Sequence, residues 1–257
     1  MYIVKYEKVK TNDNFELDVE IRIPGVKPKK TVVMCHGLTS SKQCRRNQLF
    51  KLANRLWEND YKVIQFDFRG HGDSSGCDLD VSLSSFQKDL TTIIDKYINK
   101  DEEFYMFGFS NGALAINRYI YLTNDSRIKK VAFIGAPLDP INSSFLNPNT
   151  IFYKDTYEAI QNGSLEKNGY VELKSKNWRV SKKFLDECYN YDYNTAISYL
   201  ENKAFILHGK DDTRVDINFN REFAKKYNIR FKEYNATHSL FETLEDAMQD
   251  IVLYFDE

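Results

Sequence analysis

The sequence predicts an α/β fold with a mostly parallel central sheet that is flanked by helices. Short continuous apolar runs recur along the chain, as is typical of strands that are buried on both faces of a parallel sheet. Amphipathic helical patterns lie between these runs, and this alternation favours a doubly wound sheet with right-handed crossovers. The 257 residues are enough for one large domain, or for one domain with an insertion.

The first two predicted strands differ from the later ones. They cover about 2–10 and 15–23 and flank Asn12-Asp13-Asn14, a typical hairpin turn. The opening stretch MYIVKYEKVK alternates apolar and charged residues, which indicates a strand and not a signal peptide. The remaining predicted strands cover 31–35, 61–67, 103–109, 131–136, 204–208 and 229–234. The sheet is therefore expected to have about eight strands.

Helices are predicted where apolar residues recur at a spacing of three or four residues between the strands. Leu49, Leu52 and Leu56 share one helix face, and similar patterns cover about 90–97 and the residues after Gly112. Near the end of the chain, helices are expected at about 217–227 and 241–255.

The alternation of strands and helices breaks between residues 138 and 200. This stretch holds eleven aromatic residues among Asn- and Lys-rich intervals, with short helices possible at 181–189 and 194–202. Because so many aromatic side chains must bury against something, we interpret the stretch as a cap over the carboxyl edge of the sheet; a plain surface excursion is the alternative. The expected domains are a core of residues 1–137 and 201–257 and an inserted cap, or lid, of residues 138–200.

Composition and charge exclude several classes of function. The apolar fraction is 42%, and acidic and basic residues nearly cancel to a formal charge of -1. No basic cluster suits a nucleic acid or an anionic membrane, and no apolar run could span a bilayer. Cys35, Cys44, Cys77 and Cys188 form no C-x-x-C pair and fit reduced thiols better than a disulfide or zinc framework. We expect a soluble cytoplasmic protein that binds no metal and no nucleic acid.

Polar residues collect directly after the predicted strands, where the carboxyl ends of parallel strands meet. After 103–109 comes Ser110, within the pattern G-x-S-x-G formed by Gly108-Phe109-Ser110-Asn111-Gly112. The pattern alone decides little, because glycine and serine are common residues. The four histidines of the chain also lie at strand ends. They are His36, His71, His208 and His238.

A serine hydroxyl needs an adjacent base to act as a nucleophile, and that base needs an acid to orient it. His238 follows the last strand in a polar loop and is the expected base. The other three histidines are interpreted as structural: His208 as held by hydrogen bonds, His36 as part of a loop whose backbone is needed, and His71 as the brace of a tight turn.

The expected acid is Asp212, which follows the strand before the last one. Asp211 is its near rival and Asp139 a further alternative, whereas Asp216 fits the N-cap of the next helix. The resulting order Ser110, Asp212, His238 is that of the nucleophile-elbow enzymes.

An oxyanion site is expected from two backbone N–H groups, those of Asn111 and Leu38. Asn111 would begin a helix, whose N-terminal dipole favours negative charge. Leu38 lies on the loop after the strand 31–35, next to His36 and Gly37, which are expected to support the site. Gly108 and Gly112 are expected to be glycines because a sharp strand-to-helix turn leaves no room for a Cβ atom.

Five ordered motifs resemble those of the α/β-hydrolase superfamily over nearly the whole chain. HGLTSSK resembles the oxyanion loop, FDFRGHGDSSG the loop after the fourth strand, GFSNG the nucleophile elbow, LHGKDD the acid turn and THSLF the histidine loop. The monoacylglycerol lipase and cinnamoyl (feruloyl) esterase branch is the most similar, and it carries a cap of similar size at the same place. Two departures weaken a subfamily assignment: Phe109 and Asn111 stand where many relatives have His or Gln, and Val215-Asp216 replaces Val-Pro.

The resemblance implies ester hydrolysis through an acyl-enzyme, with no cofactor. The expected substrate is a small or medium ester, apolar or aromatic if the aromatic residues of the cap contact it rather than only pack the cap. A thioesterase, an acyltransferase or a hydrolase of carbon–carbon bonds would use the same three residues. A non-catalytic binding protein of this fold is a third reading, which the presence of all three residues disfavours.

Overall fold

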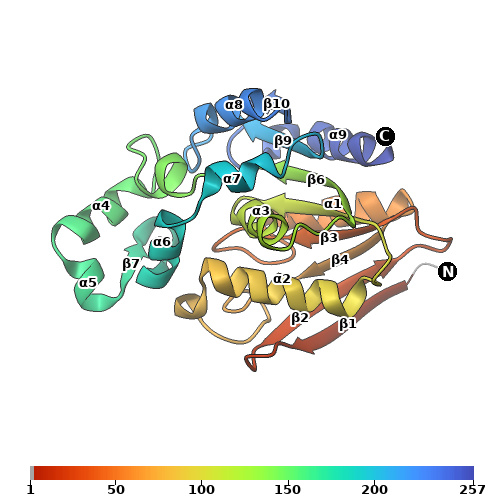
Figure 1. Ribbon diagram of the computed structural model, residues 1–257, viewed down its shortest axis with the longest axis horizontal. Helices are drawn as coiled ribbons and strands as arrows, with labels where there is room; N and C mark the ends of the chain where they lie inside the picture. Colours follow the sequence, from red (N-terminus) through yellow and green to blue (C-terminus); the bar gives the residue numbers. More distant parts are fainter. Residues whose placement is uncertain (1–2) are drawn as a thin grey trace.

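The computed structural model describes residues 3–257, so the predicted start of the first strand at residue 2 lies outside the described part. Within it, eight strands form one sheet in the order β1-β2-β4-β3-β5-β6-β9-β10 (Figure 1). β1 and β2 form an antiparallel hairpin, β2 is antiparallel to β4, and the other neighbours are parallel. The predicted α/β-hydrolase fold, with its mostly parallel sheet of eight strands, is confirmed.

The strands lie close to the ranges that the apolar runs predict. Their bounds are β1 (Ile3–Lys10), β2 (Glu16–Ile23), β3 (Thr31–Cys35), β4 (Lys62–Phe66), β5 (Phe104–Phe109), β6 (Ile128–Ile134), β9 (Ala204–Gly209) and β10 (Arg230–Tyr234). β6 begins three residues before its apolar run, because Lys129 and Lys130 interrupt the hydrophobic pattern but still belong to the strand. Lys130 pairs with Tyr105 of β5, and its ammonium donates to the carbonyl of Tyr254 at 2.6 Å.

Helices cover both faces of the sheet. They are α1 (Gln48–Glu58), α2 (Leu83–Tyr97), α3 (Asn111–Thr123), α8 (Ile217–Lys226) and α9 (Leu244–Asp256). α1 and α9 pack in one hydrophobic cluster, and α2, α3 and α8 in the other (Figure 1). β3 supplies both clusters, since Val32 and Val33 point to opposite faces of the sheet. This layering explains why the parallel strands read as continuous apolar runs.

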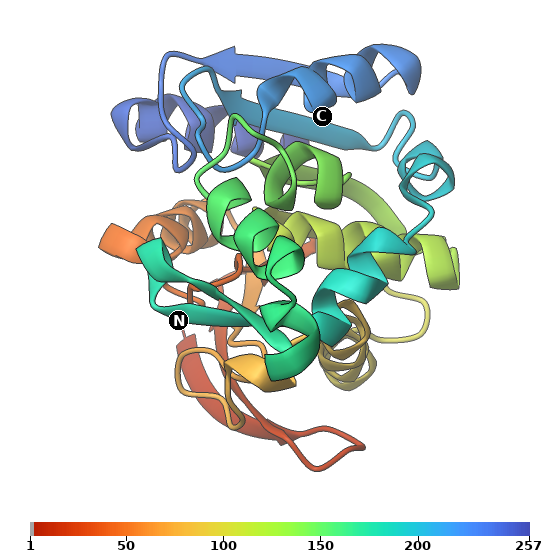
Figure 2. The ribbon, with the colours of Figure 1, turned by 90° about the vertical axis from the view of Figure 1, so that its left-hand side faces the viewer.

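The 138–200 segment is more structured than its sequence pattern indicates. It contains a π-helical turn (Ile141–Phe145), α4 (Tyr153–Gln161), α5 (Ser164–Asn168), the hairpin strands β7 (Tyr170–Leu173) and β8 (Trp178–Ser181), α6 (Lys182–Tyr189) and α7 (Tyr193–Ser198). Figure 2 shows α4 and the β7–β8 hairpin in front of the sheet. Strands of only four residues carry too few alternating positions to be predicted from their pattern.

Most aromatic residues of the 138–200 segment pack inward. Phe145, Phe184 and Tyr191 belong to the main hydrophobic cluster, with 2%, 1% and 6% of their surface exposed. Phe184 contacts Phe86 of α2 at a ring-centroid distance of 6.1 Å, which ties the segment to the core. The density of aromatic residues is thus explained by packing.

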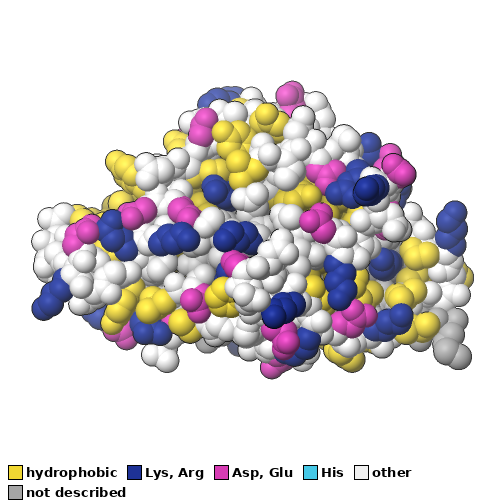
Figure 3. Space-filling model, turned by 60° about the horizontal axis from the view of Figure 1, so that its bottom comes forward, with side chains coloured by type: hydrophobic (Ala, Val, Ile, Leu, Met, Phe, Trp, Pro, Cys, Tyr) yellow, Lys and Arg dark blue, Asp and Glu magenta, His cyan; other side chains and the backbone are white. Residues whose placement is uncertain are grey.

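The surface mixes charges of both signs with small apolar areas, as Figure 3 shows for one face. This agrees with the formal charge of -1. Among residues 3–257, no helix is both long enough and apolar enough to cross a membrane.

Candidate active site

Ser110 lies on a sharp turn between β5 and α3. Its φ of 52° and ψ of −125° fall in a region that non-glycine residues rarely adopt, and such strain is typical of the turn that presents a nucleophile. The backbone N–H of Ser110 donates to the carbonyl of Ile134 at 2.8 Å, which holds the turn against β6.

The two glycines of this turn are required by close packing. A Cβ atom on Gly112 would lie 2.2 Å from the carbonyl oxygen of Cys35, and one on Gly108 would lie 2.6 Å from the backbone of Ala113. Both obstacles are backbone atoms, which cannot swing aside. The sequence-based explanation of Gly108 and Gly112 therefore agrees with the geometry.

His238 and Asp212 form a buried hydrogen-bonded pair. The Nδ1 atom of His238 lies 2.7 Å from Oδ2 of Asp212, whose side chain is fully buried. Asp211, the rival candidate, is exposed. Asp139 instead accepts hydrogen bonds from Asn142 Nδ2, at 2.9 Å for the shorter one. Of the three candidate carboxylates, the one that meets His238 is that of Asp212.

Four donors hold the carboxylate of Asp212. Besides His238, Nε2 of His208 lies 2.9 Å from Oδ2, and the backbone N–H groups of Arg214 and Val215 donate to Oδ1 at 2.8 and 3.1 Å. Burial alone would raise the pKa of Asp212, but the charges and hydrogen bonds of His238 and His208 hold it well below its usual value. The carboxylate is therefore ionised and fixed in place.

His238 is an uncharged imidazole at neutral pH. Burial lowers its pKa, the positive charge of Arg214 lowers it further, and Asp212 only partly opposes this. With Nδ1–H donated to Asp212, the Nε2 atom keeps its lone pair, which a base requires. The ring packs against Phe109 at a centroid distance of 5.2 Å, which gives that residue of the turn a structural role.

The other histidines are held within the protein. His208 accepts a hydrogen bond at Nδ1 from Asn220 at 2.9 Å. His36 donates from Nδ1 to the Gly37 carbonyl at 2.8 Å and accepts at Nε2 from the Phe68 N–H at 3.0 Å, and burial lowers its pKa. His71 donates to the Arg69 carbonyl at 2.9 Å. These contacts match the structural interpretation of all three.

The loop after β3 approaches Ser110 closely. A Cβ atom on Gly37 would lie only 2.9 Å from the Cβ atom of Ser110, so a larger residue would collide with the serine. Leu38, the next residue, borders the same cavity as Ser110, and Asn111 begins α3 directly after it. The two backbone groups expected to bind an oxyanion thus belong to elements that meet at the serine.

Ser110 and His238 border one small cavity of about 90 Å³. The remaining residues around it come from the end of β5, the loop after β3, the turn after β9, the histidine loop and the β7–β8 turn. They are Leu38, Thr39, Ser40, Cys44, Phe109, Ser175, Lys176, Arg214 and Ser239. Ser175 and Lys176 show that the 138–200 segment forms part of the wall. The sequence did not indicate Lys176 or Arg214, since neither belongs to a motif.

Comparison with known protein families assigns the chain. Residues 26–187 match the family described as serine aminopeptidase, S33. The chain belongs to this family of α/β hydrolases. Its resemblance to the α/β-hydrolase superfamily is thereby confirmed, and the protein is an enzyme of a hydrolase family.

Solved structures share the fold of this hydrolase over nearly their whole length. Est1E from Butyrivibrio proteoclasticus, solved with ferulic acid bound, is 16% identical with a TM-score of 0.76, and 97% of each chain is covered. The Pyrococcus furiosus esterase Pf2001 is 21% identical, with a TM-score of 0.70, and covers 99% of this chain and 92% of its own. The Exiguobacterium antarcticum esterase EaEST is 19% identical with a TM-score of 0.72, and the match covers 98% of this chain and 100% of the esterase.

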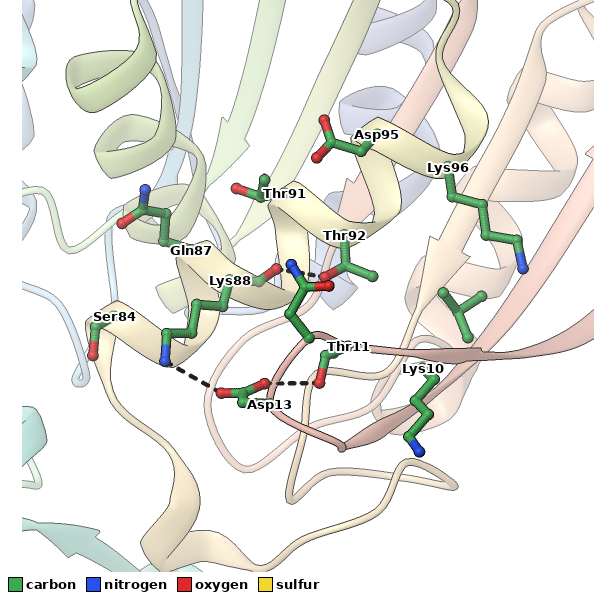
Figure 4. A pocket seen from close by; sticks show the side chains of 12 residues that line it. Lys10, Thr11, Asp13, Ser84, Gln87, Lys88, Thr91, Thr92, Asp95 and Lys96 are labelled. Atoms are coloured by element: carbon green, nitrogen blue, oxygen red, sulfur yellow. Dashed lines mark hydrogen bonds and ion pairs between the residues drawn. The ribbon is translucent and has the colours of Figure 1, made fainter.

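A larger cavity of the hydrolase lies elsewhere. It has a volume of about 730 Å³ and lies between the β1–β2 hairpin and α2 (Figure 4). Two of its charged groups are paired, since Asp13 accepts from Lys88 at 3.3 Å, and Asp13 also accepts from Arg69 at 2.8 Å. None of the candidate catalytic residues lines it.

A cluster of three carboxylates in the described part of the chain has the spacing of a cation site. It consists of Asp18, Asp67 and Asp73. The ammonium of Lys42 lies among them, 2.6 Å from Asp18, 2.8 Å from Asp67 and 3.4 Å from Asp73. Since a lysine already supplies the positive charge, the cluster is explained as a partly buried ion-pair network.

Proposed function

We propose that this hydrolase is a serine carboxylesterase that acts on esters with a small acyl group. The observation that carries the proposal is the hydrogen-bonded pair of Asp212 and His238, with His238 bordering the same cavity as Ser110. The cavity of about 90 Å³ is several times smaller than typical ligand pockets, so only the part of a substrate around its carbonyl group would be enclosed.

The acylation step follows from these positions. The Oγ atom of Ser110 attacks the ester carbonyl, and its proton passes to Nε2 of His238. The new C–O bond leaves a negative charge on the carbonyl oxygen, which the N–H groups of Leu38 and Asn111 would bind. Asp212 stabilises the imidazolium that forms. The bond to the alcohol then breaks, and His238 returns the proton to the departing alkoxide.

Deacylation repeats the sequence with water. His238 takes a proton from a water molecule, whose oxygen attacks the carbonyl carbon of the acyl-serine. The bond to Ser110 breaks, its oxygen regains the proton from His238, and the carboxylic acid leaves. No bond in this cycle needs an electron donor or acceptor, so the residues of the chain account for the whole reaction.

The family name raises a second candidate, cleavage of an N-terminal residue from a peptide. An aminopeptidase must bind a free ammonium group near the scissile bond. The described residues around the cavity include Lys176 and Arg214 but no carboxylate side chain, which disfavours a cationic substrate. Thioesters would react by the same steps, because the transfer of the acyl group to Ser110 is the same for an oxygen ester and for a thioester.

The test compares Ser110→Ala with Ser198→Ala, an exposed serine on α7. We expect Ser110→Ala to reduce turnover of p-nitrophenyl acetate at least about 10³-fold and to abolish labelling by a fluorophosphonate, with no such loss in Ser198→Ala. The values of kcat/KM for oxygen esters and for thioesters with the same acyl group are then compared in the wild type, which shows which of the two classes the enzyme prefers. Full activity of Ser110→Ala would contradict the proposal.

A further inference from the structure

Two cationic side chains border the cavity that contains Ser110. Lys176 comes from the turn between β7 and β8, and Arg214 from the turn that follows β9. They belong to segments far apart in the sequence and converge on one small space. Among the described residues that line this space, none carries a carboxylate side chain. The charge of the lining is therefore positive.

The position of each cation is constrained. The backbone N–H of Arg214 is bonded to Asp212 at 2.8 Å, so its place depends on the buried carboxylate. Lys176 lies two residues before Trp178, whose ring stacks on His71 at a centroid distance of 4.7 Å. Arg179, the next residue, binds Asp78 through its guanidinium at 2.6 Å. Both cations are thus presented by anchored turns.

The electrostatic influence of Arg214 reaches the reacting groups. Burial is the main cause of the lowered pKa of His238, and the charge of Arg214 adds to it. The same field that disfavours an imidazolium favours an anion within the cavity that Arg214 lines. Coulomb interactions are stronger in such an enclosed site than in bulk water.

We propose that the hydrolase selects esters that carry a carboxylate close to the scissile bond, and that Lys176 and Arg214 bind this carboxylate. The proposal rests on the proposed esterase function. A cavity of about 90 Å³ admits only a short group, so a carboxylate a few bonds from the ester carbonyl would lie near both cations. Arg214 can offer two parallel N–H donors to a carboxylate, and Lys176 adds a point charge.

The test uses two pairs of esters that differ in charge. Methyl hydrogen succinate and dimethyl succinate place the carboxylate, or its neutral equivalent, on the acyl side. The second pair, acetoxyacetate and its methyl ester, places it on the alcohol side, and release of acetate is measured. For each pair, kcat/KM of the anionic ester is divided by that of the neutral ester in the wild type, Lys176→Gln, Arg214→Gln and a control. Lys154→Gln is the control, because it removes the same charge from an exposed position on α4.

We expect the ratio to fall about tenfold in Lys176→Gln and in Arg214→Gln for at least one pair, and to stay at the wild-type value in Lys154→Gln. The pair that responds shows which side of the ester carries the charge. Hydrolysis with the same ratio in all four proteins would overturn the charge preference while leaving the esterase intact. If the wild type hydrolysed neither the four esters nor p-nitrophenyl acetate, the esterase function itself would be overturned.

Discussion

The carboxyl edge of the sheet and the 138–200 segment contribute to the same cavity in different ways. Ser110, Asp212 and His238 stand at strand ends, where backbone hydrogen bonds and close packing fix their positions. The 138–200 segment supplies Ser175 and Lys176 from a hairpin turn. The edge positions the groups that would react and supplies Arg214, whereas the segment adds one wall of the space beside them and the charge of Lys176.

The two regions also differ in how closely their glycines are packed. At the edge, a Cβ atom on Gly37, Gly108, Gly112 or Gly209 would lie within 3 Å of another atom. On the segment, a Cβ atom on Gly163 or Gly169 would meet nothing within 4 Å. The strand ends around Ser110 and His238 are therefore closely packed, whereas the two glycine positions of the segment have free space around them.

The largest effect is expected for Asp212, whose buried carboxylate lies at the carboxyl edge of the sheet. Asp212→Asn would remove the charge that orients His238 and stabilises its imidazolium, and we expect turnover of p-nitrophenyl acetate to fall about 10⁴-fold. Asp211→Asn is the matched control, since this neighbouring carboxylate is exposed. Steady-state kinetics of both variants test the assignment. A larger loss in Asp211→Asn than in Asp212→Asn would show that the acid has been misassigned.

A pair of glycine substitutions compares the packing of the two regions. Gly112→Ala would drive a Cβ atom against the carbonyl of Cys35, and we expect a loss of about 3 kcal/mol in the free energy of unfolding. Gly163→Ala meets no atom but forces alanine to the φ of 73°, which costs about 1 kcal/mol. Urea denaturation measures both values. Equal losses in the two variants would contradict the contrast between the closely packed edge and the segment.

The sequence predicted the edge well, because its constraints are local. A buried parallel strand appears as a continuous apolar run, and a strand-to-helix turn of this sharpness needs Gly108 and Gly112. The proximity of His238 to Asp212 could be expected because β9 and β10 are parallel neighbours with adjoining carboxyl ends. The sequence favoured Asp212 but separated it only weakly from Asp211, because both residues follow the same strand; the structure adds the hydrogen bond between Asp212 and His238.

The 138–200 segment was less predictable, because tertiary packing determines its structure. The strand β7 has four residues and pairs only with β8, so its pattern is too short to distinguish from a loop. Nothing in the sequence around Lys176 distinguishes it from the other lysines of the chain, and only the folded structure places it at the cavity. No local signal identifies such a residue, since the contact depends on where the hairpin packs.

The smallest effect concerns how the segment is attached to the core. Arg179 of β8 binds Asp78 through Nε at 2.9 Å and through Nη2 at 2.6 Å, and its backbone N–H donates to the same carboxylate at 3.0 Å. Arg179→Gln would remove the side-chain bonds and leave the His71–Trp178 stack in place. We expect limited proteolysis within residues 138–200 to become about two- to fivefold faster, because cleavage follows the population of the opened segment.

Lys167→Gln is the control for this attachment, since it removes the same charge from an exposed position on α5. Its cleavage rate should equal that of the wild type. If Arg179→Gln were also cleaved at the wild-type rate, the ion pair would not contribute to holding the segment. The other contacts of the segment with the core, such as the hydrogen bond from Ser181 Oγ to the Val81 carbonyl, would then be sufficient. If cleavage accelerates, the position of Lys176 at the cavity depends in part on the ion pair between Arg179 and Asp78. High salt, which screens this pair, should then also accelerate cleavage of the wild type.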